Sequence, residues 1–294
     1  MSPPLLSIAR LCAAAGNDRA TLILRDVSFE LARGEVHGLV GESGAGKSTI
    51  AKAILDILPQ GIRLSGGTIA LEGRDLLTLD AAARRRLIGA GVSLIPQDPL
   101  TALNPGRRIE AQLTDGLRMW RGMSAKAARE RALQLLDEVQ MRDPERVMRA
   151  YPHELSGGMR QRVLIAAAFA LEPKLVIADE PTTALDVTVQ KQILRLIRAL
   201  QERHGTGVVF VTHDLGVVAQ ICDRATLLYM GKVMEQGTVA SLLEHPTHPY
   251  TKALMEACPR YDEPGRGLAP VPEAVFAACR AEIAAFDRAE AVHD

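Results

Sequence analysis

The chain has 294 residues, which is enough for one large domain or two modest ones. It carries 35 basic and 35 acidic residues, and the formal net charge of zero argues against a protein that holds nucleic acid on a basic face. Aromatic residues make up only 3% of the sequence, which argues against platforms that stack single-stranded bases or sugars.

The first third of the chain is predicted to be rich in β-strands. Residues 27–31 and 36–40 have the pattern of strands, and a turn at 33–35 separates them. A glycine-rich loop follows, and residues 48–58 are predicted to form a helix. Residues 66–71 begin a further hairpin. We therefore expect a β-rich layer that leads into a strand–loop–helix unit.

The middle of the chain, from about residue 109 to 170, is predicted to be helical because its apolar residues follow a helical period. Residues 127–139 show this period most clearly. The most apolar stretch, 163–178, is interrupted by a Glu-Pro-Lys sequence. No run reaches the roughly 20 apolar residues of a membrane-spanning helix, so we expect any work at a membrane to go through partner subunits.

Strands and helices alternate again in the last third. Continuous apolar runs predict buried strands at 175–178, 208–211 and 225–230, and a helix is predicted over 187–201. Alternation of this kind implies a mostly parallel sheet.

Beyond about residue 244 the pattern weakens. Residues 245–250 and 263–272 are predicted to be extended linker, and residues 274–291 a final surface helix. No signal peptide is expected, because Arg10 breaks the apolar run near the N-terminus and no basic segment precedes it. The four cysteines are Cys12, Cys222, Cys258 and Cys279, and none falls in a C-x-x-C pair, so no spacing supports a zinc or cluster site. A reduced, intracellular chain is the simple expectation.

A complete G-x-x-x-x-G-K-[ST] sequence lies between a predicted strand and a predicted helix, the context that a phosphate-binding loop requires. Glycines let backbone N–H groups surround phosphate oxygens, and the helix N-terminus adds partial positive charge. Lys47 is expected to reach the terminal phosphates of ATP, and the Ser48 hydroxyl to bind Mg²⁺. The residues expected to bind the nucleotide here are Gly41, Glu42, Ser43, Gly44, Ala45, Gly46, Lys47, Ser48 and Thr49.

Two adjacent carboxylates end the predicted strand at 175–178. The carboxyl end of a strand in an open α/β sheet faces the crevice where ligands bind. Asp179 is therefore expected to hold Mg²⁺ through water, and Glu180 to act as the general base that polarises the attacking water.

Further short sequences identify a family. Residues 155–162, Leu-Ser-Gly-Gly-Met-Arg-Gln-Arg, resemble the signature sequence of ATP-binding-cassette (ABC) proteins. Gln97 matches the family's Q-loop, Asp186 in Ala184-Leu185-Asp186 matches its D-loop, and His213 matches its switch histidine. The resemblance covers roughly residues 5–255 and keeps the order of the family's landmarks.

The resemblance implies a P-loop NTPase fold of the α/β class, with a RecA-like core, a mostly parallel sheet, an antiparallel β layer and an inserted helical subdomain. It implies that two cassettes sandwich two ATP molecules, so that Ser156, Gly157 and Gly158 of one grip the nucleotide held by the other. Asp186 of the D-loop is also expected to bind nucleotide. Gln97 is expected to touch both Mg²⁺ and the attacking water, and His213 the terminal phosphate.

The adenine contact departs from the family pattern. The family places an aromatic residue after its first strand, and the matching position here falls near Ala15, with no aromatic residue before Phe29. Stacking on a base is worth about 1–3 kcal/mol. The expectation is therefore either weak selectivity for ATP over GTP or a different packing of the first strand.

Three segments point to a branch of the family. Residues 58–63, 99–105 and 248–254 look like the oligopeptide, dipeptide and nickel branch of bacterial importers. Membership implies an ATPase subunit docked beneath integral membrane permeases at the cytoplasmic face of the inner membrane. It also implies a second ATPase subunit and an extracytoplasmic solute-binding protein, but no nucleic acid.

The resemblance divides the chain into a nucleotide-binding domain over 1–243, with a helical subdomain near 100–165, and a C-terminal extension over 244–294. Peptide importers commonly carry a cysteine cluster in this extension, but Cys258 and Cys279 are too few for an iron–sulfur site, so none is expected. Peptide uptake is the first reading. A nickel or other small-solute importer is the alternative, and a soluble ABC ATPase without a permease comes last.

Overall fold

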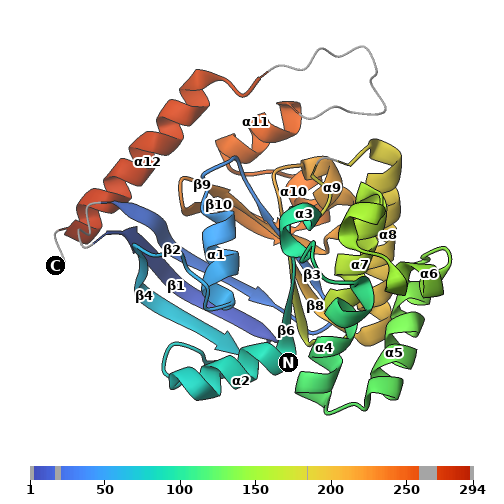
Figure 1. Ribbon diagram of the computed structural model, residues 1–294. Coiled ribbons are helices and arrows are strands. Elements are labelled where there is room, and N and C mark those ends of the chain that lie inside the picture. Colours follow the sequence, from blue (N-terminus) through green and yellow to red (C-terminus); the bar gives the residue numbers. More distant parts are fainter. Residues whose placement is uncertain (1–2, 17–20, 184, 258–269, 292–294) are drawn as a thin grey trace. The chain divides into compact units, whose positions relative to one another are not determined.

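The computed structural model describes residues 3–16, 21–183, 185–257 and 270–291 (Figure 1). The chain divides into two compact units, which are taken in turn. The helix-rich unit comprises Met1–Leu6, Leu31–Val36 and Ala70–Val211, and the phosphate-loop unit comprises Ser7–Glu30, His37–Ile69 and Thr212–Asp294. Within the described part of the chain, no helix is both long enough and apolar enough to cross a membrane.

A mixed sheet forms the centre of the phosphate-loop unit, with its strands in the order β4-β1-β2-β10-β9-β3. β3 runs parallel to β9, whereas β9 and β10 form an antiparallel hairpin. The predicted strands near 27–31, 36–40 and 225–230 are confirmed. The bounds are β1 Leu6–Ala15, β2 Leu22–Leu31, β3 Val36–Val40, β4 Ile62–Leu71, β9 Arg224–Tyr229 and β10 Lys232–Thr238.

The helices of this unit differ from the sequence prediction at one boundary. The helix predicted over 48–58 ends at Ile54, because Asp56 takes a left-handed conformation with φ of 57° and Pro59 follows soon after. The bounds are α1 Lys47–Ile54, α9 Leu215–Ile221, α10 Val239–Glu244, α11 Pro249–Ala257 and α12 Glu273–Ala291.

The C-terminal helices give one correction and one confirmation. The prediction of a linker over 245–250 is wrong at its end, since α11 begins at Pro249, and proline is well suited to the first position of a helix. The helix predicted over 274–291 is confirmed as α12. Most of the second predicted linker, 263–272, lies outside the described residues.

Three parallel strands form the core of the helix-rich unit, in the order β8-β7-β6. Residues 175–178 of β7 and all of β8 are buried, as their continuous apolar runs predict. The chain has an α/β fold with a mixed sheet, which confirms the predicted class. The strand bounds are β5 Arg74–Asp75, β6 Val92–Ile95, β7 Leu175–Asp179 and β8 Gly207–Thr212.

Helices α3 to α7 lie between β6 and β7 in the sequence, where helical structure was predicted, and α4, α5 and α6 pack on one another. The helix α2 and the four-residue strand β6 were not predicted. The bounds are α2 Ala81–Gly91, α3 Pro99–Ala102, α4 Ile109–Arg121, α5 Ala125–Glu138, α6 Pro144–Arg149, a 3-10 turn at Pro152–Glu154, α7 Gly157–Phe169 and α8 Val187–His204.

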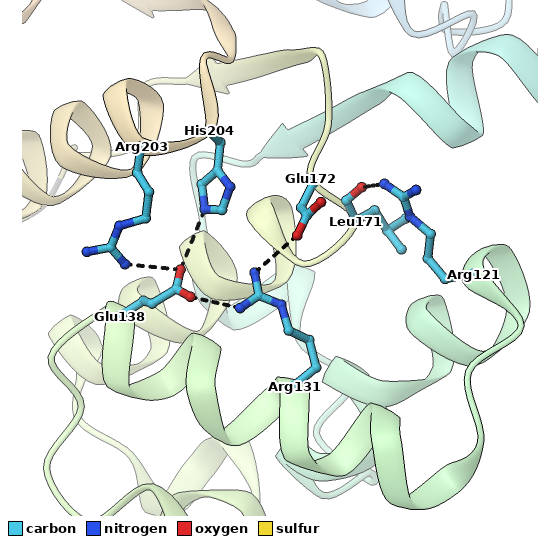
Figure 2. Close-up of polar contacts among 7 residues, drawn as sticks. All are labelled: Arg121, Arg131, Glu138, Leu171, Glu172, Arg203 and His204. Atoms are coloured by element: carbon cyan, nitrogen blue, oxygen red, sulfur yellow. Dashed lines mark hydrogen bonds and ion pairs between the residues drawn. The ribbon is translucent and has the colours of Figure 1, made fainter.

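An ion-pair network centred on Glu138 links α5 to the end of α8 (Figure 2). Arg131 Nη1 donates a hydrogen bond of 2.8 Å to Glu138 Oε1. Arg203 Nη1 lies 3.6 Å and His204 Nε2 3.5 Å from Glu138 Oε2. Arg131 also reaches Glu172, in the turn after α7, at 3.8 Å. Since the side chains of Glu138 and Arg131 are each only 16% exposed, solvent screens this network less than a surface pair.

Replacing Glu138 with glutamine is expected to lower the free energy of unfolding at pH 7 by about 1.5–3 kcal/mol, the usual value of a hydrogen bond to a charged group. Burial pushes the pKa of Glu138 upward, but the hydrogen bond and charge of Arg131, with His204 and Arg203, outweigh it and leave the pKa lowered. The carboxylate therefore stabilises the fold fully above its ordinary pKa of 4.5, and this stabilisation is lost as pH falls through the lowered value.

Urea unfolding at pH 7 and near pH 3 measures this effect, and the gap between parent and Glu138→Gln should shrink at the acid pH. Glu202→Gln is the control, since its pair with Arg198 is on the surface and is worth less than about 1 kcal/mol. If the difference in free energy of unfolding between the parent and Glu138→Gln is the same at both pH values, the lost stability comes from packing and not from the charge of Glu138.

Candidate functional site

The predicted phosphate loop lies between β3 and α1 in the phosphate-loop unit. Gly46 precedes the helix with φ of 94°, and no side chain caps the helix start among the residues that the structure describes. The first-turn N–H groups are thus left to bind an anion. A Cβ at Gly46 would lie 2.6 Å from Leu24 Cδ2, so both the backbone conformation and the space require glycine.

Close packing also fixes the start of the loop. A Cβ at Gly41 would lie 2.2 Å from the carbonyl oxygen of Leu228, at the end of β9. Only glycine allows the two backbones to approach this closely. The loop is therefore seated against the β9–β10 hairpin of its own unit.

The Lys47 side chain binds the start of the phosphate loop. It is buried, and Nζ donates hydrogen bonds to the carbonyl oxygens of Gly41 at 2.7 Å and Glu42 at 2.9 Å. The ammonium is thus held across the loop, where a phosphate can replace the carbonyls as its partner. Ser48 and Thr49 follow in the first turn of α1 and are half-buried.

The switch histidine belongs to the same unit. His213 is exposed and follows the end of β8, one residue before Asp214 caps α9. The Asp214 N–H donates to Thr212 Oγ1 at 3.0 Å, and this turn holds the backbone on both sides of His213.

The adjacent carboxylates lie in the helix-rich unit, at the end of β7. Asp179 is the last residue of the strand, and Glu180 takes a left-handed conformation with φ of 46°. Glu180 Oε2 accepts a hydrogen bond from Thr183 Oγ1 at 3.0 Å and one from Gln97 Nε2 at 3.4 Å. The fold thus brings together two residues that are 83 positions apart and that were both predicted to handle the attacking water.

Thr183 was missed at the sequence level. It lies three residues after Glu180, and its N–H also donates to the Glu180 carbonyl oxygen at 3.2 Å. A threonine three residues after a strand-end acid is the signal that points to such a turn.

Two further predicted residues act as helix caps in the helix-rich unit. Ser156 Oγ accepts from the Met159 N–H at 3.4 Å at the start of α7, and Gly157 and Gly158 form its first turn. Asp186 Oδ1 accepts from the N–H groups of Thr188 at 3.0 Å and Val189 at 2.9 Å. Asp186 therefore caps α8, while Ala184, quoted with it, lies outside the described residues.

The predicted residues fall in both units. The phosphate-loop unit carries residues 41–49 and His213, and the helix-rich unit carries Gln97, Ser156–Gly158, Asp179, Glu180 and Asp186. Among the described residues, no group of three or more His, Cys, Asp or Glu side chains is placed to hold a metal ion. Since Cys258 lies outside the described residues, the absence of an iron–sulfur cluster stays a prediction.

Two family descriptions match the chain. Residues 24–183 match the ABC transporter family, and residues 234–283 match the C-terminal region of oligopeptide/dipeptide transporters.

Similar proteins include the "Probable D,D-dipeptide transport ATP-binding protein" of Escherichia coli (strain K12), which is 46% identical over 94% of this chain and 84% of its own length. The oligopeptide transport ATP-binding protein of Salmonella typhimurium is 45% identical over 85% of this chain and 74% of its own length. Among solved structures, a dimeric post-hydrolysis ATP-binding cassette bound to ADP and Pi is 27% identical with a TM-score of 0.70, over 80% of this chain and 98% of that chain.

Proposed function

Since this chain belongs to the ABC transporter family of ATPases, we propose that it is the ATP-hydrolysing subunit of a bacterial importer of oligopeptides or dipeptides. One observation carries the proposal: the same chain matches the family's ATPase over 24–183 and the peptide branch's C-terminal region over 234–283. The latter match favours peptides over nickel or another small solute.

ATP binding begins at the phosphate loop. The first-turn N–H groups of α1 and the Lys47 ammonium offer a concentrated set of donors to the β- and γ-phosphates. When ATP enters, Lys47 exchanges the Gly41 and Glu42 carbonyls for phosphate oxygens, so little reorganisation is needed.

Magnesium fits the oxygen donors that the chain offers. The Ser48 hydroxyl, the Asp179 carboxylate and the Gln97 amide oxygen are hard ligands of the kind that Mg²⁺ prefers. The ion would neutralise charge on the phosphates.

Glu180 is the proposed general base. Hydrogen bonds from Thr183 and Gln97 orient its carboxylate, and one oxygen can accept a proton from the attacking water. His213 is proposed to contact the terminal phosphate and to help stabilise the transition state.

The active assembly is proposed to be a pair of cassettes, in which Ser156, Gly157 and Gly158 of one grip the ATP held by the other. A similar solved cassette is a dimer in a post-hydrolysis state bound to ADP and Pi, which supports the pairing. The pair would close on ATP, and loss of the phosphate bridge after hydrolysis would let it open. We propose that the pair docks on two integral permeases at the cytoplasmic face of the membrane, with a solute-binding protein on the other side.

Reconstitution tests this function. The chain is co-expressed with candidate permease subunits and a candidate second ATPase, and the complex is placed in proteoliposomes with a candidate binding protein. Di- or oligopeptides are expected to stimulate ATP hydrolysis and accumulate inside, whereas Ni²⁺ has no effect. Stimulation by Ni²⁺ alone would support the nickel reading. A chain that hydrolyses ATP but associates with no permease would contradict import.

A further inference from the structure

Residues 228–231 comprise the end of β9 and the turn into β10, and they contact the phosphate loop; they are called the 228–231 turn. The Gly231 N–H donates to the Ala45 carbonyl oxygen at 3.1 Å. The Leu228 carbonyl occupies the space that a side chain at Gly41 would need. One short turn therefore contacts both the beginning and the end of the loop, and its position sets where the loop lies.

Helix α12 holds this turn through Arg25. The guanidinium of Arg25 donates to the Met230 carbonyl oxygen at 2.7 Å and forms a two-pronged pair with Asp287 of α12, at 2.7 and 2.9 Å. The Arg25 N–H also donates to the Gly231 carbonyl oxygen at 2.8 Å. The Arg25 side chain is only 10% exposed, and a bidentate pair in such surroundings fixes geometry as well as adding energy.

A second ion pair strengthens the attachment. Lys232, the first residue of β10, lies 2.5 Å from Glu282, one helical turn before Asp287. Glu282 is also 3.3 Å from His248, which precedes α11. The turn is thus tied to α12 in two ways, indirectly through Arg25 and directly through Lys232.

Helix α11 packs against the same turn, and α11 and α12 contact each other (Figure 1). The Tyr229 ring lies 5.2 Å from the ring of Tyr250 in α11 and 5.6 Å from that of Phe276 in α12. Tyr250 is fully buried, in a cluster completed by Met234, Cys279 and Ile283.

Glu235 of β10 fixes the start of α11. Its carboxylate accepts hydrogen bonds from the Thr247 N–H at 2.9 Å, the Thr247 hydroxyl at 2.7 Å and the His248 N–H at 3.0 Å. Burial acts to raise the pKa of Glu235, but the influence of the Thr251 hydroxyl and these three bonds lower it to about 2. The segment that enters α11 is therefore anchored on the hairpin at neutral pH.

Glu42 influences the Tyr250 hydroxyl electrostatically. Burial raises the pKa of this hydroxyl, the negative charge of Glu42 adds to the rise, and the Glu42 backbone N–H opposes it. Glu42 is the second residue of the phosphate loop. The hydroxyl oxygen is buried, and no hydrogen bond of ordinary geometry reaches it within the described ranges.

We propose that the C-terminal segment, α11 and α12, positions the phosphate loop through the 228–231 turn, with Asp287 as the positioning residue. The proposal rests on the nucleotide-binding role of the loop and not on the identity of the transported solute. It gives the region after residue 244 a part in ATP binding, so that displacing α12 weakens the grip on nucleotide.

MgATP affinity of the purified, full-length chain tests this proposal. Asp287→Ala is expected to raise the Kd for MgATP about tenfold, the equivalent of ~1.4 kcal/mol, with kcat at saturating ATP within about twofold of the parent. Asp287→Glu, which keeps the charge, should recover most of the affinity. Glu256→Ala, an exposed carboxylate on α11, is the matched control and should leave the Kd unchanged.

Two further variants guard against simple misfolding. Asp287→Asn keeps the side-chain shape but weakens the pair, and Tyr250→Phe keeps the buried ring but removes the hydroxyl. Both should fold with parental helix content by circular dichroism. Asp287→Asn should raise the Kd for MgATP, whereas Tyr250→Phe should keep the parental Kd, because it preserves the packed ring and removes no hydrogen bond among the described residues. A parental Kd in folded Asp287→Asn would overturn the proposal. Failure of the parent itself to bind MgATP would instead overturn the function proposed above.

Discussion

Lys47→Ala is expected to weaken MgATP binding by a factor on the order of 10²–10³ and to abolish measurable hydrolysis. The ammonium is buried and held by two loop carbonyls, so it is desolvated and in place before the phosphates arrive. Removing one partner of a buried, charge-assisted contact costs about 2–5 kcal/mol. A factor of 10²–10³ corresponds to about 2.7–4.1 kcal/mol, within that range. Isothermal titration of the purified chain with MgATP measures the change directly.

The control for this variant is Lys52→Ala, which removes a lysine from the last turn of the same helix. Lys52→Ala should bind MgATP as the parent does. Thermal unfolding without nucleotide separates lost binding from lost structure, because ligand stabilisation scales with affinity. A Lys47→Ala protein that binds and hydrolyses ATP at the parental rate would show that this loop is not the nucleotide site.

The phosphate loop was predictable because its chemistry is local. Its glycines, lysine and serine lie within eight consecutive positions. The glycines allow the loop conformation, the lysine is suited to phosphate and the serine to Mg²⁺, so the pattern can be recognised without knowledge of distant residues. The buried strands β7 and β8 were predictable for a similar reason, since a continuous apolar run has few alternatives in a chain of this kind.

Contacts between distant segments were not predictable from single residues. The hydrogen bond from Gln97 to Glu180 depends on β6 and β7 lying side by side, and β6 has only four residues, too few for a periodic pattern. Its pairing to β7 places Gln97, two residues beyond its end, beside Glu180. The resemblance to a family named both residues but did not give their contact.

The start of α11 illustrates a tertiary effect that overrides local sequence. Two prolines within residues 245–250 favour an extended chain when read alone. The carboxylate of Glu235, which lies 12 positions before Thr247, binds the N–H groups that precede the helix and makes Pro249 its first residue. A prediction of this boundary needs the β9–β10 hairpin first, because the hairpin presents Glu235.

Glu180→Gln is expected to lower the rate of ATP hydrolysis by about 10²–10⁴-fold, the usual contribution of a positioned general base, while MgATP affinity stays within a few-fold of the parent. Glutamine has nearly the same shape and still offers an oxygen to Thr183 and Gln97, but it does not take a proton from water. The variant therefore removes the proton transfer and leaves the surrounding hydrogen bonds available.

Loss of the general base should have a second measurable effect, which a variant with weakened ATP binding would not show. If ATP bridges two cassettes, the variant should accumulate as a closed pair in MgATP, detected as a doubled mass by light scattering, and return to single subunits when ATP is replaced by ADP. Glu202→Gln, on the exposed face of α8, is the matched control and should turn over ATP at the parental rate. Parental turnover in Glu180→Gln would remove Glu180 from the role of base, and the proton would then have to pass to another acceptor near the terminal phosphate.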